Sequence, residues 1–109
     1  MQQAIKKILK FQKQRNWKKF HLPKNLAISL AIESAEVLEL FQWNLNHNFP
    51  KAKKNQLSDE LADVYYYLLL LCHVCNIDLK RAFNKKMIKN EQKYPVDKAK
   101  GNSKKYSEL

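Results

Sequence analysis

Apolar residues recur at helical spacing in four separate stretches of the chain. These stretches cover about residues 2–17, 24–43, 57–75 and 78–92. Apolar residues at every third or fourth position are typical of amphipathic helices. We expect Pro23 to lie in the first turn of the second helix, Ser58 or Asp59 to cap the third and Asp78 to cap the fourth. The pattern therefore predicts an all-α four-helix bundle with a polar connection over 44–56.

The stretch 94–109 breaks this pattern. It is rich in Lys, Ser and Asn, and Pro95 lies near its start. Such a composition is typical of irregular chain. A length of 109 residues is enough for one domain and short for two. We therefore expect a single domain over 1–109, with a helical core over about 1–93 and a basic tail over 94–109.

The net charge and the two cysteines indicate which binding partners and which cellular compartment to expect. The net charge is +11, from 21 Lys+Arg against 10 Asp+Glu, which suits polyanions or simply makes a solvated lysine-rich surface. Cys72 and Cys75 lack a second ligand pair, so we expect inert packing in a reducing, cytoplasmic setting. The longest apolar run, 64–72, is about half of a membrane span, and the N-terminus has no signal-peptide pattern. No membrane association is expected.

Two pairs of carboxylates interrupt the apolar stripes. Glu33 lies in the middle of the stripe of the second helix, and Glu36 follows three residues later. Glu60 and Asp63 repeat this arrangement on the third helix. Residues three apart lie about 60° apart around a helix, so each pair projects from one side. One such pair is common on a solvated helix edge, and that interpretation stays open. Two pairs on the packing faces of neighbouring helices are harder to explain in this way.

A bound cation would explain these carboxylates. An unpaired carboxylate costs several kcal/mol to bury, and four together would repel one another. Ligands that are all oxygen favour Mg²⁺, with Mn²⁺ as a substitute, over zinc or copper. Magnesium held in this way commonly binds substrate phosphates as well. The pattern therefore indicates phosphoryl-transfer chemistry.

Two longer runs contain the acidic pairs, LAISLAIESAEVLELFQW (26–43) and DELADVYYYLLLL (59–71), and three shorter segments are FHLPKN (20–25), NEQKYP (90–95) and SKKYSEL (103–109). The two runs resemble the MazG-like all-α nucleotide pyrophosphohydrolases, and among them the dCTP pyrophosphatase branch, in which the three segments also have counterparts. The resemblance implies Mg²⁺-dependent hydrolysis of a nucleoside triphosphate, dCTP or a related pyrimidine deoxynucleotide, to the monophosphate and pyrophosphate. Strongly apolar helical faces in so small a chain predict a homodimer or homotetramer.

The resemblance also implies roles for individual residues. The metal ligands would be Glu33, Glu36, Glu60 and Asp63, with Glu33 or Glu36 as the catalytic base. The expected substrate-binding residues are Trp17 and Trp43 at the base, Tyr67 and Asn90 facing the nucleotide, and His21, Lys93, Tyr94, Lys105 and Tyr106 near the substrate or in a closing tail. Tyr65 and Tyr66 are expected in the core or in a subunit interface.

The chain departs from the resemblance at two places. Some dCTP-preferring members have a first-helix histidine at the position of Ile8, and the connection 44–56 is shorter here than in animal members. Both differences bear on which base is accepted.

The sequence also raises three alternative functions. A basic helical module would bind nucleic acid in a salt-sensitive way, which explains the charge and leaves the acidic pairs unexplained, so a nucleic-acid partner is not favoured. A catalytically silent MazG-like relative would keep the ligands without turnover. A ferritin-like di-iron bundle needs Glu-x-x-His ligands, which His21, His47 and His73 do not provide.

Overall fold

The computed structural model describes residues 1–44, 49 and 51–109, and it contains no strand in these ranges. The predicted all-α class is therefore confirmed. His47 and part of the predicted connection 44–56 lie outside the described residues. The chain divides into two compact units, residues 1–76 and 77–109, and each is described by itself. The expectation of one domain with its core ending near residue 93 stays a prediction.

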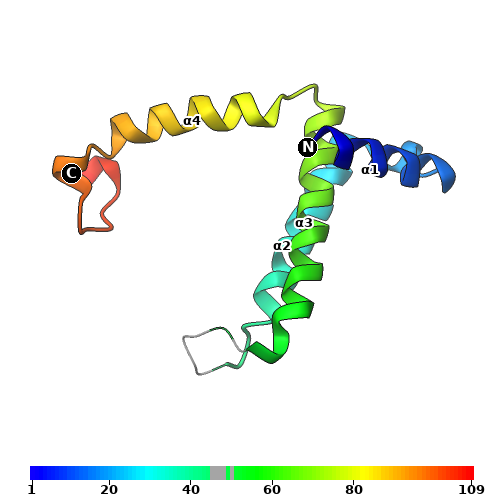
Figure 1. Ribbon diagram of the computed structural model, residues 1–109, viewed down its shortest axis with the longest axis horizontal. Coiled ribbons are helices and arrows are strands. Elements are labelled where there is room, and N and C mark those ends of the chain that lie inside the picture. The colour runs from blue at the N-terminus through cyan, green and yellow to red at the C-terminus, as the bar shows by residue number, and fades with distance from the viewer. Residues whose placement is uncertain (45–48, 50) are drawn as a thin grey trace. The chain divides into compact units, whose positions relative to one another are not determined.

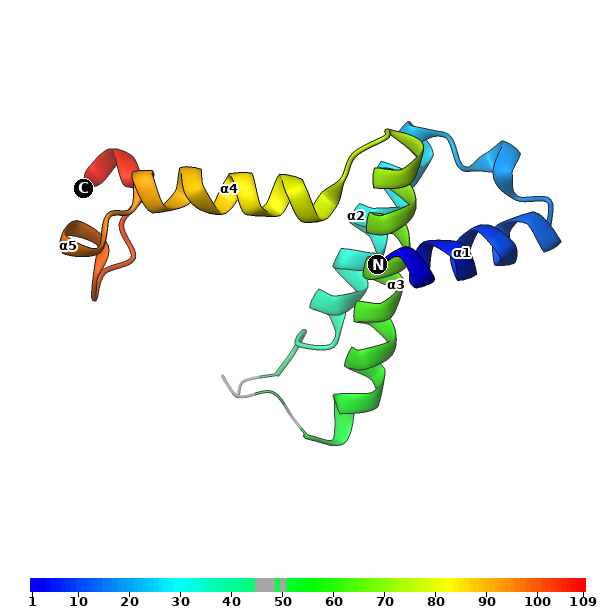
Figure 2. The same cartoon turned by 45° about the horizontal axis from the view of Figure 1, so that its top comes forward.

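The first unit is built on a helical hairpin. It contains α1 (Gln2–Gln14), the 3₁₀ turn η1 (Lys18–Phe20), α2 (Pro23–Glu39), the 3₁₀ turn η2 (Lys51–Lys53) and α3 (Lys54–Val74). Helices α2 and α3 run antiparallel along one another, and α1 packs across α3 (Figures 1 and 2). The buried apolar side chains of this core are Ile8, Leu26, Leu69, Leu70 and Cys72.

The leucines explain why the hairpin forms. Leu26 of α2 and Leu70 of α3 are fully buried, and burying a leucine side chain contributes roughly 1.5–3 kcal/mol. Pro23 lies in the first turn of α2, as predicted, where its missing N–H costs no helical hydrogen bond. The antiparallel packing brings the middle of α2 beside the first half of α3.

Three predicted helix boundaries were wrong. Helix α1 ends at Gln14, because Asn16 adopts a left-handed φ of 54°. Helix α2 ends at Glu39 and the chain turns, with Trp43 at a φ of 66°. Helix α3 begins at Lys54, before the expected residue 57.

The predicted caps of α3 were also wrong. The residue that precedes the helix is Lys53, and it makes no side-chain capping bond. The Ser58 hydroxyl instead donates to the Lys54 carbonyl at 3.0 Å, within the helix. Both members of the acidic pair on α3 therefore lie in the helix interior.

The second unit consists of α4 and the C-terminal segment. It contains α4 (Leu79–Lys93), α5 (Val96–Ala99) and the 3₁₀ turn η3 (Tyr106–Glu108). The Arg81 backbone N–H donates to the Asp78 carboxylate at 3.1 Å, so the predicted cap of α4 is confirmed. The tail was expected to be irregular, and α5 and η3 are the short helical turns within it.

Several large apolar side chains of the first unit remain exposed. They include Ile28 and Ile32 on α2 and Leu61 and Tyr65 on α3. Both cysteines are free thiols; Cys72 is buried and Cys75 is exposed. In the part of the chain that the structure describes, no helix is both long enough and apolar enough to cross a membrane.

A candidate metal centre beside an aromatic pocket

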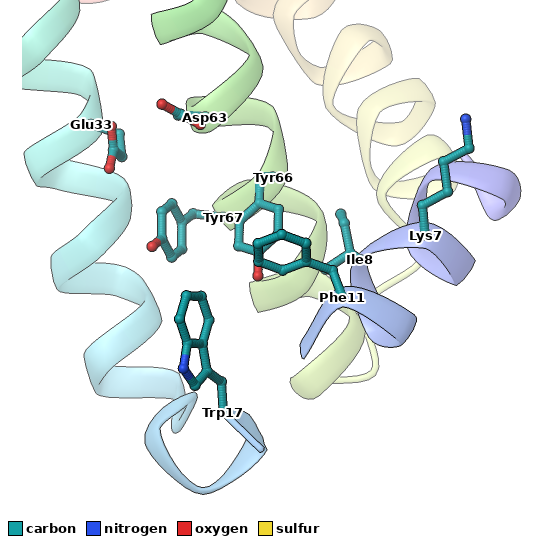
Figure 3. Close-up of a pocket in the computed structure, with 8 residues that line it drawn as sticks. All are labelled: Lys7, Ile8, Phe11, Trp17, Glu33, Asp63, Tyr66 and Tyr67. Atoms are coloured by element: carbon teal, nitrogen blue, oxygen red, sulfur yellow. The ribbon is translucent and has the colours of Figure 1, made fainter. Parts of the chain in front are cut away.

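Three of the four predicted ligands form a cluster. Glu33 and Glu36 of α2 and Glu60 of α3 each place a carboxylate oxygen within 4.8 Å of the others. Asp63, one turn after Glu60, is not part of this group. It lines a neighbouring cavity together with Glu33, and the two residues lie on facing helices (Figure 3).

The ionised carboxylates of this cluster are unfavourable in their present surroundings. The Oε2 atoms of Glu33 and Glu60 are buried and have no hydrogen-bond partner. Burial, the hydrogen bond with Glu36 and the charges of the nearby acids together raise the pKa of Glu33 to about 7, with burial as the largest cause. The pKa of Glu60 is also raised, first by a hydrogen bond with Glu36 and then by burial. Such shifts mean that the ionised carboxylates are destabilised in the absence of a cation.

The residues present fit a divalent cation. Their donors are all carboxylate oxygens, which suit hard ions. Two of these oxygens are buried without a partner, and a cation would provide one. It would also remove the repulsion between the acids, because a bound ion is commonly the largest charge in its site. Glu33, Glu36 and Glu60 are therefore the residues that could hold it.

A cavity of about 440 Å³ adjoins the acidic cluster. It is lined by Lys7, Ile8, Phe11, Trp17, Glu33, Asp63, Tyr66 and Tyr67. Figure 3 shows the two acids at one end and the aromatic rings at the other. The volume lies in the range that is common for small-molecule sites. With a cation held by the acids, the cavity could therefore take a molecule with one anionic end and one flat end.

The aromatic end is built from rings in series. Phe11 packs edge-on against Trp17, with centroids 5.6 Å apart, and against Tyr66 at 6.1 Å. Tyr66 in turn meets Tyr67 at 4.9 Å with an interplanar angle of 80°. The Arg15 guanidinium lies 3.7 Å from the centre of the Phe11 ring. Edge-to-face pairs contribute about 0.5–1.5 kcal/mol each beyond burial, so this wall is held in place by its own contacts.

Of the predicted substrate residues in the first unit, some line the cavity and others do not. Trp17 and Tyr67 line the cavity. His21 does not line it; its ring meets Trp17 edge-on at 6.2 Å, and the Gln12 amide donates to its Nδ1 at 2.8 Å. Burial lowers the pKa of His21, which favours the neutral ring that this hydrogen bond requires. Trp43 is 90% exposed and is absent from the cavity lining, so its role stays a prediction.

The remaining predicted contacts lie in the second unit. They are Asn90, Lys93, Tyr94, Lys105 and Tyr106. Within this unit the Tyr94 and Tyr106 rings lie 6.3 Å apart, and the Lys93 ammonium lies 4.7 Å from the centre of the Tyr106 ring. The tail thus returns to the end of α4. The substrate roles of these residues stay predictions.

Sequence reasoning missed part of the cavity wall. Phe11 was not among the expected site residues, and Tyr66 was expected in the core or in an interface; both line the cavity. A signal for Tyr66 was present, because it follows Asp63 by three residues and shares its helix face. No comparable signal identified Phe11, because its partners come from other segments.

The fold and the site together define a class: an all-α protein with a carboxylate cluster beside an aromatic ligand pocket. The model of the MazG-like family matches residues 28–109. The chain therefore belongs to the MazG-like family, and the resemblance seen in the sequence is confirmed.

Curated relatives and a solved structure agree with this assignment. The chain is 38% identical to dCTP pyrophosphatase 1 of Mus musculus and 40% identical to that of Rattus norvegicus, in each case over 104 residues and 91% of its length. It spans 61% of the length of each of these relatives. The crystal structure of a pyrophosphatase from Archaeoglobus fulgidus superposes with a TM-score of 0.83 at 42% identity, covering 87% of this chain and 92% of that one.

Proposed function

We propose that the chain hydrolyses a nucleoside triphosphate, dCTP or a related pyrimidine deoxynucleotide, to the monophosphate and pyrophosphate in the presence of Mg²⁺. The observation that carries the proposal is the pair of buried, partnerless oxygens of Glu33 and Glu60 beside a cavity with an aromatic end. The names of the relatives, dCTP pyrophosphatase 1 and a pyrophosphatase, support this reaction class.

The acidic residues would serve both binding and proton transfer. Glu33, Glu36 and Glu60 would hold the cation, with Asp63 beside them. When bound, Mg²⁺ or its substitute Mn²⁺ supplies charge neutralisation and polarises phosphoryl oxygens. Glu33 or Glu36 would orient a water molecule and accept its proton. The water oxygen forms a bond to the α-phosphorus, the bond from this phosphorus to the bridging oxygen breaks, and its electron pair leaves with pyrophosphate.

The aromatic end would hold the base. Trp17 and Tyr67 present flat, largely apolar surfaces, and stacking of a base on such rings is worth about 1–3 kcal/mol. The walls are already in contact with one another, so little order has to be gained on binding.

A second copy of the chain is the proposed protein partner, as a homodimer or homotetramer. The exposed apolar side chains of α2 and α3, such as Ile32 at 54% and Leu61 at 50%, support it. Light scattering of the purified chain should therefore give two or four times the mass of 13.0 kDa.

An activity panel tests the proposed reaction. The chain is incubated with each of the common NTPs and dNTPs in Mg²⁺, in Mn²⁺ and in a chelator, and monophosphate and pyrophosphate are quantified. We expect equal amounts of both products, dependence on the metal and preference for a pyrimidine deoxynucleotide. Nucleotide binding without cleavage would identify a catalytically silent relative. Salt-sensitive DNA binding without metal would support the nucleic-acid alternative instead.

A further inference from the structure

Three buried side-chain oxygens have no hydrogen-bond partner in the described part of the chain. Two are the Oε2 atoms of Glu33 and Glu60, which the proposed metal accounts for. The third is the hydroxyl of Tyr66, in the aromatic wall of the same cavity. A metal at the carboxylates does not explain this third atom, because a phenol in an aromatic wall is not a ligand for a hard cation.

No group in the described part of the chain hydrogen-bonds the Tyr66 hydroxyl, although Arg15 and Tyr67 lie near enough to influence its pKa. The Tyr66 ring packs edge-on against Phe11 and Tyr67, and Ile8, also in the wall, is 7% exposed and has an apolar side chain. The Tyr67 hydroxyl differs, because it is paired with Ser29. Burial raises the pKa of the Tyr66 phenol, so the hydroxyl keeps its proton at neutral pH.

A neutral hydroxyl can donate one hydrogen bond and accept others. Leaving such a group buried and unpaired is costly, and a ligand that pairs with it recovers this cost. The aromatic faces around it select poorly, because every base has a face that can stack. Figure 3 shows Lys7 extending away from the rings, and the acids lie at the other end of the cavity. The Tyr67 hydroxyl and the Trp17 indole N–H also belong to the wall, but the first is paired with Ser29 and the second can only donate. The Tyr66 hydroxyl is therefore the group in the wall that can both donate and accept and that has no partner within the described part of the chain.

We propose that Tyr66 is a specificity-determining residue whose hydroxyl hydrogen-bonds an amino or carbonyl group on the edge of the nucleotide base. The inference rests on the proposed function, because that function identifies the ligand as a nucleotide. The new claim is that the Tyr66 hydroxyl is the group that selects the base. A site built around a hydrogen bond rejects ligands that cannot make it, whereas a purely apolar pocket discriminates weakly.

The direct test is Tyr66→Phe, which removes one oxygen and keeps the ring and its edge contacts. Steady-state constants are measured for dNTPs that differ only in the base. For the preferred base we expect kcat/KM to fall about tenfold, through KM, with kcat almost unchanged. For the other bases we expect changes within about twofold, so the preference is largely lost. Tyr65→Phe is the matched control, because Tyr65 is 43% exposed and lies outside the cavity wall; it should keep the preference.

Either of two results with Tyr66→Phe would overturn the inference. One is an unchanged base preference; the other is an equal loss for every base, which would mean that the residue only supports the wall. A wild-type chain with no base preference would overturn it as well. A binding assay tests the role of Tyr66 separately from the proposed reaction. Non-hydrolysable triphosphate analogues are titrated with Mg²⁺ present, and tryptophan fluorescence reports their binding. If the analogues bind with a base preference that Tyr66→Phe removes but no triphosphate is cleaved, the proposed reaction fails and the role of Tyr66 stands.

Discussion

The two ends of the cavity differ in how they are held together. At the acidic end, side chains from α2 and α3 converge although their charges repel, and two of their oxygens lack partners. At the other end the rings stabilise one another, and the buried Tyr66 hydroxyl has no hydrogen-bond partner among the described residues. The acidic end therefore depends on a ligand to reach its ionised state, while the aromatic end is preformed. We therefore expect the acidic end to decide whether a reaction occurs, and the aromatic end to decide which molecule is accepted.

The largest expected effect comes from Glu60→Gln at the acidic end. The change keeps the shape of the side chain and removes its charge. Metal ions contribute several kcal/mol of transition-state stabilisation, so we expect kcat/KM to fall about a thousandfold or more. Pyrophosphate release measures the loss. Glu39→Gln is the control, because Glu39 is an exposed acid on α2 and should leave the rate unchanged. Glu60→Gln with near wild-type activity would refute the ligand role.

The second effect concerns the stability of the acidic end without metal. The pKa of Glu33 is raised from 4.5 to about 7. Its contribution to the free energy of unfolding is therefore present below pH 4.5 and is lost as the pH rises through 7. A fixed Mg²⁺ concentration of a hundred times its Kd at pH 8 should restore about 2.7 kcal/mol at that pH, or about 10 °C in Tm. The same concentration should give a smaller gain at pH 5.5, because protons then compete with the ion for the carboxylates. Thermal unfolding with Mg²⁺ and with chelator measures this, and an equal gain in Glu60→Gln would contradict it.

The third effect tests the aromatic end through Trp17→Ala. Loss of a stacking surface should weaken nucleotide binding about tenfold or more. Because the acidic cluster is untouched, kcat should change little. Trp17→Phe keeps a flat ring and should recover most of the affinity. A fall in kcat with unchanged KM would show that the two ends are not separable in the way proposed.

The smallest effect is expected at His21, behind the wall. His21→Ala removes the edge contact with Trp17 and should raise KM about threefold. His21→Phe retains a ring at this position and should return KM toward the wild-type value, if the residue acts by positioning Trp17. A loss of the same size in His21→Phe would instead indicate that the imidazole contacts the nucleotide, as the sequence resemblance implies.

The acidic end was predictable from the sequence, and the aromatic end was predictable only in part. Helical periodicity places Glu33 and Glu60 on packing faces, and an antiparallel hairpin then brings them together. Trp17 and Trp43 look alike in the sequence, but only Trp17 lines the cavity. Trp43 follows the end of α2 in a left-handed conformation, which the apolar pattern does not encode. Contacts between segments, such as that of Phe11 with Tyr66, are likewise invisible to periodicity.

The position of the acids within the hairpin has a consequence for how the chain can vary. Glu33 lies six residues before the end of α2, and Glu60 lies six residues after the start of α3. The two donors thus sit at equal depth, more than one helical turn from the connection that joins the helices. Insertions or deletions between residues 40 and 53 should therefore leave the chelating geometry intact, so this connection is free to diverge among homologues while the chemistry is retained.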